Sequence, residues 1–311
     1  MIPLSIQDYF YRKGTIRVHA GRLSVNPIIT PGMSDTTGDN INGPSLIKVP
    51  SWIDKPLGKY YLYFAHHKGE SIRLAYADSP EGPWKIHESG TLQLNQTICS
   101  GHIASPDVHI DEKNKLIKMY FHGPVKGFKN QVSLLATSVD GISFSPNTDV
   151  LGDSYFRVFE WNKRIYAFSR TGKLYYSNGH ERFEYSHNPF ERFILKSRVR
   201  HLAIKIHNNT LLVFYSRIGE YPEKILMSEI DLLKDPHKWT ASRPVTVLKP
   251  ECDYEGANLP VTHSKNGVAR FPEHSLRDPA VFTDDDQLFL LYSVAGEQGI
   301  AIARLYLQVT Q

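Results

Sequence analysis

One short pattern recurs five times along the chain and constrains the fold more than any other feature. Each copy is a β-prone run that ends in small or polar residues, and a second β-prone run precedes it across a polar turn. The five runs are GKYYLYFAHH (58–67), KLIKMYFHG (115–123), KRIYAFSRT (163–171), TLLVFYSRI (210–218) and QLFLLYSVA (287–295). Turns rich in Asn, Asp and Gly between strand-like runs indicate β-hairpins.

A third β-prone run follows each hairpin, so one unit holds three or four antiparallel strands. The units begin near residues 44, 106, 156, 202 and 279. A unit of this size cannot bury both of its faces alone, so neighbouring units must complete the core. We therefore predict an all-β fold, a five-bladed β-propeller in which each blade is a small antiparallel sheet. A β-sandwich is the alternative, but it does not predict five copies of one hairpin-plus-strand unit.

The whole chain is expected to form one domain. We assign residues 1–311 to a single propeller, with residues 1–40 as an N-terminal extension and ring-closing strand. Abundant aromatic residues (17 Tyr, 15 Phe and 4 Trp) favour strands over helices. No amphipathic helix emerges from the pattern of apolar residues.

Composition argues against several classes of function. The net charge is only +4 and no long run of Lys or Arg appears, so we expect no nucleic-acid partner. Two distant cysteines, Cys99 and Cys252, suggest neither a disulfide framework nor a zinc site. The sequence has no signal-peptide pattern at its start and no apolar run of about 18 residues. We therefore expect no membrane association and a cytoplasmic location.

The propeller topology predicts where a site lies. The start of each innermost strand and the end of the next strand share one rim, so these ends should converge around a central funnel. Any one polar residue there is more often simply solvated or hydrogen-bonded, and only the convergence favours a site. The candidates from the strand starts are Asn42, His102, Asp107, Arg157, Arg200, His201, Arg277 and Asp278. Those from the second strands are His66, His67, His122, Arg170, Arg217 and Ser293, and the stretch before the last unit adds Glu255 and His274.

This mixture of side chains suits a polyhydroxylated or anionic ligand. Arg binds carboxylate or sulfate in a bidentate manner. Glycoside cleavage needs an acid that protonates the leaving oxygen and a base that activates water. A histidine can replace the acid, because its pKa lies near neutrality. Signatures of serine hydrolases, P-loops and dinucleotide-binding folds do not occur in a suitable context.

Two segments resemble glycoside hydrolase family 43. IASPDVHIDEKNKLIKMYFHG is similar to its second-blade motif, and LRDPAVFTDDDQLFLLYS is similar to an inner strand of the same five-bladed clan. The closing stretch, from YEGANLP to GIAIARL, also resembles family 117. The resemblance covers most of residues 40–306. It implies a propeller glycosidase, and the family 117 likeness implies that a histidine such as His67, His122, His201 or His274 serves as the acid.

The chain departs from family 43 at the catalytic positions. That family draws a base Asp from the first blade, an Asp from the third and an acid Glu from the fourth. Here the first position reads Asn42-Gly43-Pro44, the third has only Asp153 nearby, and the fourth reads Arg200-His201-Leu202. The family triad therefore does not transfer. Asp107 and Asp278 are the carboxylates that do.

The leading hypothesis is a glycoside hydrolase that acts from the end of a chain on an unusual or anionic sugar. Its catalytic candidates are Asp107, Asp278, His67, His122 and Glu255; its substrate-binding candidates are Asn42, His66, His102, Arg157, Arg200, His201, His274 and Arg277. The partner is a carbohydrate. No cofactor is required, and a central divalent cation, which some members of the clan hold, has no defensible ligand set here. A propeller that binds saccharide without cleaving it, and a phosphorylase or lyase in the same funnel, are the alternatives.

Overall fold

The computed structural model describes residues 15–177, 182–191 and 198–309. The strands described are β1 (Ile16–Arg22), β2 (Asn42–Lys48), β3 (Tyr60–Ala65), β4 (Arg73–Ala77), β5 (Lys85–His87), β6 (Ala104–Asp111), β7 (Leu116–Gly123), β8 (Val132–Ser138), β9 (Ser145–Pro146), β10 (Gly152–Asp153), β11 (Arg157–Trp161), β12 (Arg164–Phe168), β13 (Leu174–Ser177), β14 (Phe183–His187), β15 (Val199–His207), β16 (Thr210–Arg217), β17 (Ile225–Asp231), β18 (Val245–Leu248), β19 (Arg277–Asp284), β20 (Gln287–Ser293) and β21 (Ile300–Val309). Short 3-10 helices are η1 (Leu94–Gln96), η2 (Arg170–Gly172), η3 (Pro236–Lys238) and η4 (Asp253–Glu255).

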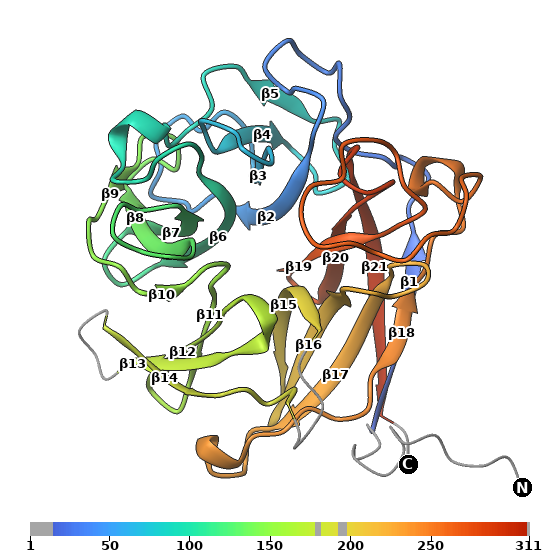
Figure 1. Cartoon of the computed structure of the whole chain (residues 1–311). Coiled ribbons are helices and arrows are strands. Elements are labelled where there is room, and N and C mark those ends of the chain that lie inside the picture. Colours follow the sequence, from blue (N-terminus) through green and yellow to red (C-terminus); the bar gives the residue numbers. More distant parts are fainter. Residues whose placement is uncertain (1–14, 178–181, 192–197, 310–311) are drawn as a thin grey trace, which may run out of the picture.

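These strands form five antiparallel sheets arranged in a ring (Figure 1). The sheet orders are β2-β3-β4-β5, β6-β7-β8-β10 with β9 also on β8, β11-β12-β13-β14, β15-β16-β17-β18, and β19-β20-β21-β1. We number the blades one to five in that order. The strands β2, β6, β11, β15 and β19 lie innermost (Figure 1). The prediction of an all-β, five-bladed propeller is confirmed.

The repeated sequence run is the second strand of each blade. It forms β3, β7, β12, β16 and β20 in turn, and each pairs with the inner strand before it. The fifth blade is built from both ends of the described chain, because β1 pairs with β21 from Ile16 opposite Val309 to Arg22 opposite Ala303. This pairing joins the two ends of the ring.

The hydrophobic core lies between the blades. Five clusters of buried side chains occur in the described chain, and each combines residues of two neighbouring blades. Phe64 of the first blade shares a cluster with Leu291 of the fifth, and Phe214 of the fourth shares one with Tyr292 of the fifth. Both faces of every sheet are therefore covered by neighbours, which explains the near-continuous apolar runs in the second strands.

The inner strands of four blades carry a β-bulge near one end. The pairing register shifts between Asn42 and Ser45 in β2 and at the corresponding places in β6, β15 and β19. In three of these strands a residue with positive φ stands directly before a proline: Gly43 (φ 59°), Ser105 (φ 51°) and Asp278 (φ 49°). A bulge interrupts the alternation of side chains and re-aims those next to it.

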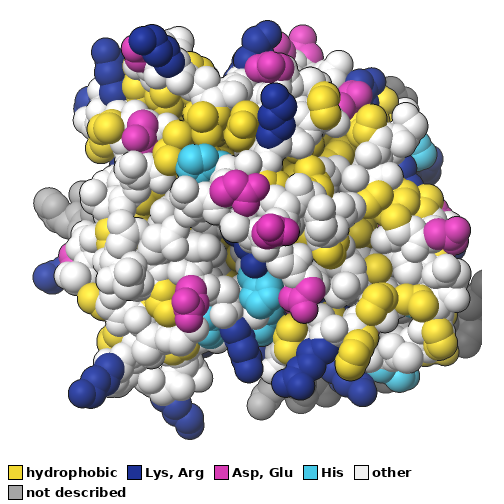
Figure 2. Space-filling view, turned by 90° about the horizontal axis from the view of Figure 1, so that it is seen from above, with side chains coloured by type: hydrophobic (Ala, Val, Ile, Leu, Met, Phe, Trp, Pro, Cys, Tyr) yellow, Lys and Arg dark blue, Asp and Glu magenta, His cyan; other side chains and the backbone are white. Residues whose placement is uncertain are grey.

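The surface has mixed charge. On the face in Figure 2, Lys and Arg side chains are interspersed with Asp and Glu, and no large patch of one sign is visible. No helix among the described residues has the length and apolar character needed to cross a bilayer.

Arg22 on β1 ties the closing strand to the fifth blade. Its Nε and a terminal nitrogen donate to the two oxygens of Glu255, at 2.8 and 3.0 Å. Glu255 is fully buried, and it also accepts from the Tyr292 hydroxyl at 2.9 Å. A carboxylate buried in this way is stabilised only while its partners remain.

We expect Arg22→Ala to lower the free energy of unfolding by about 3–5 kcal/mol, because it leaves the buried Glu255 carboxylate without its cation. Arg304→Ala is the matched control, since the side chains of its pair with Glu81 are 39% and 35% exposed and the loss should cost about 1 kcal/mol or less. Denaturant unfolding of both variants measures the difference. Equal losses would contradict the role given to Arg22.

Candidate functional site

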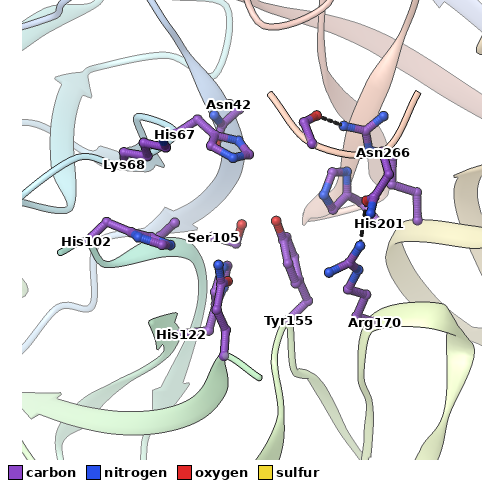
Figure 3. Close-up of a pocket in the computed structure, with 14 residues that line it drawn as sticks. Asn42, His67, Lys68, His102, Ser105, His122, Tyr155, Arg170, His201 and Asn266 are labelled. Atoms are coloured by element: carbon purple, nitrogen blue, oxygen red, sulfur yellow. Dashed lines mark hydrogen bonds between the residues drawn. The ribbon is translucent and has the colours of Figure 1, made fainter. Parts of the chain in front are cut away.

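A pocket of about 150 Å³ lies where the inner ends of the blades meet (Figure 3). Its volume is smaller than the roughly 300–1,000 Å³ of clefts that hold drug-sized ligands, so it suits one small residue. All described lining side chains are polar or small. They are Asn42, His67, Lys68, His102, Ala104, Ser105, His122, Gln131, Tyr155, Arg170, Arg200, His201, Asn266 and Gly267.

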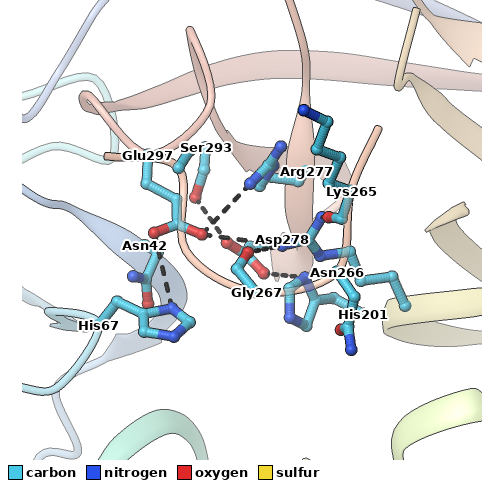
Figure 4. A network of polar contacts seen from close by, with 12 residues as sticks. Asn42, His67, His201, Lys265, Asn266, Gly267, Arg277, Asp278, Ser293 and Glu297 are labelled. Carbon is cyan, nitrogen blue, oxygen red and sulfur yellow. Dashed lines mark hydrogen bonds and ion pairs between the residues drawn. The ribbon is translucent and has the colours of Figure 1, made fainter. Parts of the chain in front are cut away.

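The structure brings together part of the predicted set. The predicted residues that line this pocket are Asn42, His67, His102, His122, Arg170, Arg200 and His201. Asp278 lies directly behind His201 (Figure 4). The remaining candidates are not among the described lining residues: Asp107, Glu255, His66, Arg157, Arg217, His274, Arg277 and Ser293.

Contrary to expectation, Asp107 does not share a rim with Asp278. Its carboxylate accepts from the Val158 amide at 2.8 Å and contacts His109 at 2.8 Å, and it lines a separate cavity of about 380 Å³. The bulge explains the difference. Asp107 lies opposite Tyr120 just as Ala280 lies opposite Leu291, so Asp107 corresponds to Ala280 and not to Asp278.

Arg157 fills the space between these two cavities. It is 6% exposed, and its guanidinium donates to the backbone carbonyls of Ser105, Phe156 and Leu202. Its donors therefore hold backbone from three blades, and it lines the cavity of Asp107 instead of the central pocket. The cavity that Arg157 lines is bounded by the inner strands of all five blades, so Arg157 and Asp107 lie in the central channel but not in the pocket that holds His201.

Three other candidates also have partners outside the pocket. Glu255 is buried against Arg22 and Tyr292, as described above. The His66 ring contacts the exposed carboxylate of Asp39 at 3.3 Å. His274 Nδ1 lies 3.0 Å from the Leu259 carbonyl. The structure therefore places these three side chains apart from the central pocket.

A histidine–carboxylate pair opens onto the pocket. His201 Nδ1 contacts Asp278 Oδ1, and Ser293 donates to the other oxygen of Asp278 at 3.2 Å. Burial raises the pKa of Asp278, but His201 and two neighbouring guanidiniums lower it further, so its pKa lies well below the usual range. Burial lowers the pKa of His201, and Asp278 opposes that effect only in part. At neutral pH the pair is thus an aspartate beside a neutral imidazole.

This arrangement selects one tautomer of His201. An ionised carboxylate only accepts hydrogen bonds, so the proton of the neutral ring belongs on Nδ1, where it faces Asp278. Nε2 then carries the free lone pair. Because His201 lines the pocket, that nitrogen is available to accept a proton from a bound molecule.

Tyr155 is a pocket residue that the sequence analysis missed. Its ring stacks on His122 with centroids 4.0 Å apart, lies 4.7 Å from the His201 ring, and directs its hydroxyl to the middle of the pocket (Figure 3). Its φ of 68° is unusual for a bulky residue and places the ring inward. Burial together with Asp278 raises the pKa of Tyr155 to about 12, so the hydroxyl stays a donor.

A buried ion cluster forms the wall behind the pocket (Figure 4). Arg277 is 1% exposed and pairs with Glu223 at 2.9 Å, Glu273 at 2.7 Å and Glu297 at 3.3 Å. Arg200 pairs with the same Glu223 at 3.3 Å. These carboxylates stand behind the lining residues, and no Asp or Glu is among the described side chains that face the pocket.

His67 joins the pocket to this cluster. Its Nδ1 lies 3.7 Å from Glu297, and its backbone amide donates to Asn40 at 2.8 Å. Burial lowers the pKa of His67 below its usual value, and the opposing effects of Glu297 and Asp278 offset this only in part. No group of three or more metal-binding side chains is arranged to hold an ion within the described ranges.

One curated protein shows clear sequence similarity to the chain. "Uncharacterized protein R118" of Acanthamoeba polyphaga mimivirus is 37% identical over 318 residues, which covers 91% of this chain and 89% of that protein. No protein-family model matches the sequence.

Solved structures share the fold at low identity. CoXyl43, a GH43 β-xylosidase/α-arabinofuranosidase from a compost metagenome, superposes with a TM-score of 0.58 at 12% identity, over 92% of this chain and 94% of that one. A GH43_1 enzyme of Xanthomonas citri gives 0.58 at 12%, over 85% and 87%. A member of the GH130 family, described as mannoside phosphorylases and glycoside hydrolases that target β-1,2-mannosidic linkages in Candida mannan, gives 0.65 at 11%, over 96% and 95%.

The pocket histidines make stability depend on pH. Burial lowers the pKa of His122 well below its usual value, with further lowering by His102 and His201. Below about pH 6.5 His122 is therefore protonated in the unfolded chain but still neutral in the folded chain. The stability of the fold falls as the pH drops below that value. One such histidine costs about 2 kcal/mol between pH 6.5 and 5.

We expect His122→Leu to lose less stability than the wild type between pH 7 and pH 5, because this penalty is removed. The exposed His237→Gln is the control and should follow the wild type. Urea unfolding at several pH values measures the three slopes. A His122→Leu slope as steep as that of the wild type would refute this account of the buried imidazole.

Proposed function

This chain belongs to the same family as the mimivirus protein R118, and from its propeller fold and pocket we propose that it is a glycosidase that removes a residue from the end of a saccharide chain. The observation that carries the proposal is the His201–Asp278 pair, which opens onto a small polar pocket. The fold neighbours are named as glycoside hydrolases, which supports carbohydrate as the substrate class. The small volume of the pocket supports an exo mode of action.

His201 is the proposed general base. Its Nε2 lone pair takes a proton from the attacking water, and Asp278 stabilises the resulting imidazolium. Asp278 does not touch the substrate in this scheme and is a positioning residue. The hydroxyl of Tyr155 and the amide of Asn42 donate hydrogen bonds to the sugar.

His67 is the proposed proton donor to the leaving oxygen. Glu297 stands 3.7 Å behind its Nδ1 and supports the protonated ring, although burial lowers the pKa of His67 overall, so the donor is the fraction of His67 that carries the second proton. Two imidazoles, each with a carboxylate behind it, would then replace the two carboxylates of a usual glycosidase. Lys68, Arg170 and Arg200 give the pocket cationic character, which favours an anionic or otherwise unusual sugar.

A second function has one specific observation in its favour. The described lining residues include no carboxylate, and carboxylates are the groups that most glycosidases use for both proton transfers. A propeller that binds a saccharide end without cleaving it fits that composition. Turnover separates the two candidates, because only the enzyme releases product.

The test is prolonged incubation of the protein with a broad panel of neutral, uronic and sulfated oligosaccharides, with and without inorganic phosphate. Released sugars are measured by chromatography and binding by thermal shift. We expect release of a terminal residue from at least one substrate, and a loss of about 100-fold or more in kcat for His201→Gln. His237→Gln should retain the wild-type rate.

Each other result has a defined meaning. Stabilisation by a saccharide without any release supports the binding protein, and release that requires phosphate supports a phosphorylase. A His201→Gln variant as active as the wild type removes His201 from the mechanism. No binding and no release across the panel would overturn the carbohydrate proposal.

The pH profile tests the pairing of His201 with Asp278. The base works when it is unprotonated, so kcat/KM should rise with pH along a limb below 6.5, because burial lowers the pKa of His201, and it should fall again at higher pH as His67 loses the proton that it donates. Asp278 raises that pKa, so Asp278→Asn should move the limb to lower pH while it reduces kcat. A limb that stays in place would show that Asp278 acts only through stability.

A further inference from the structure

A second cavity of about 400 Å³ borders the central pocket. It is lined by Lys129, Asn130, Gln131, Asp153, Ser154, Arg170, Thr171 and Lys173. Gln131 and Arg170 line both spaces, so the two cavities meet at these side chains. One wall comes from the loop between β7 and β8, and the other comes from η2 and the residues around it.

The second cavity has an excess of positive charge. Its lining includes three cations, Lys129, Arg170 and Lys173, against a single carboxylate, Asp153. Lys173 Nζ lies 2.6 Å from Asp153 Oδ2, so these two charges neutralise each other. Arg170 donates to the amide oxygen of Asn266 at 2.5 Å, a neutral partner. Lys129 is exposed and pairs with no carboxylate in the described chain, so two positive charges remain available to a ligand.

The wall that carries Arg170 is held in a strained conformation. Thr171, a β-branched residue, has a φ of 68°, which such residues rarely adopt. The turn is fixed by the Arg170 amide, which donates to the Ser154 carbonyl at 2.8 Å, and by Asn188, which donates to the Thr171 carbonyl at 2.8 Å. Strain of this kind persists where the surroundings enforce it, and it accumulates at ligand-binding sites.

We propose that this second cavity binds the sugar that follows the terminal residue, and that it selects a chain with a carboxylate or sulfate ester on that sugar. The inference rests on the glycosidase or saccharide-binding role proposed for the central pocket. Arg170, which lines both cavities, lies where the linkage between the two sugars would pass. Its planar guanidinium suits the two oxygens of a carboxylate or sulfate.

The excess of positive charge in the second cavity favours an acidic chain over a neutral one. A neutral sugar would leave Lys129 and Arg170 without counter-charges while it displaced water from them. An anionic group offsets that cost and attracts the chain from a distance at low salt. The ligand class is therefore an acidic oligosaccharide of at least two residues, and a monosaccharide reports on the central pocket alone.

The experiment measures dissociation constants by calorimetry for paired probes. Oligogalacturonides, alginate oligosaccharides and sulfated chondroitin oligosaccharides are each compared with their carboxyl-reduced or desulfated counterparts. The proteins are the wild type, Lys129→Gln and the control Lys126→Gln, an exposed lysine of the same loop that does not line the cavity.

We expect at least one acidic probe to bind about tenfold or more tightly than its neutral counterpart. Lys129→Gln should weaken that probe by about three- to fivefold, as one partly exposed ion pair predicts, and Lys126→Gln should not. The acidic monosaccharide, which reports on the central pocket alone, should bind both variants equally. Added salt should narrow the difference in affinity between acidic and neutral probes.

Other outcomes separate this inference from the function it rests on. If neutral probes bind or are cleaved as well as acidic ones, or if the two lysine variants behave alike, the anionic subsite is wrong while the saccharide function stands. If no probe of either kind binds, the saccharide function fails and the subsite fails with it.

Discussion

The guanidinium of Arg277 is the group on which the candidate site depends. It is almost fully buried and pairs with Glu223, Glu273 and Glu297, which lie in the fourth blade, before β19 and before β21. Arg200 shares Glu223 from the inner strand of the fourth blade. Buried charges are costly unless every partner is in place. The cluster therefore holds the fourth and fifth blades in one relative position. This fixes the positions of the pocket residues that these two blades carry.

This cluster also sets the polarity of the pocket. Glu297 and Asp278 stand behind His67 and His201, so the carboxylates are shielded and the imidazoles face the space where a ligand would lie. A carboxylate behind a histidine fixes the orientation and the tautomer of the ring. Metal-binding histidines are oriented in the same way, by a partner on the ring nitrogen that does not bind the metal. The site is thus organised as imidazoles in front and carboxylates behind, unlike a site that presents two free carboxylates.

The bulges of the inner strands decide which side chains reach that space. Asp278 precedes a proline and occupies the left-handed position of its bulge, whereas Asp107 follows a proline and lies beyond the bulge. The order of the two residues, Asp-Pro in one strand and Pro-Asp in the other, is a signal that was present in the sequence. Strict alternation along a strand does not reveal it, because a bulge resets the alternation.

Hairpins, repeat number and the apolar second strands were readable from the sequence, because each is encoded within a few residues by turn chemistry and β propensity. Part of the site was readable as well, since Asn42, His67, His122 and His201 sit at or next to strand ends that the propeller topology brings together. Tyr155 of the pocket was not readable, because it depends on a left-handed backbone conformation, and Lys129 of the second cavity was not, because a loop places it there. The sequence by itself determined five blades and a polar rim. Only the tertiary structure decided which rim residues face the pocket, since that choice depends on bulge register and on buried charges that pair across blades far apart in the chain.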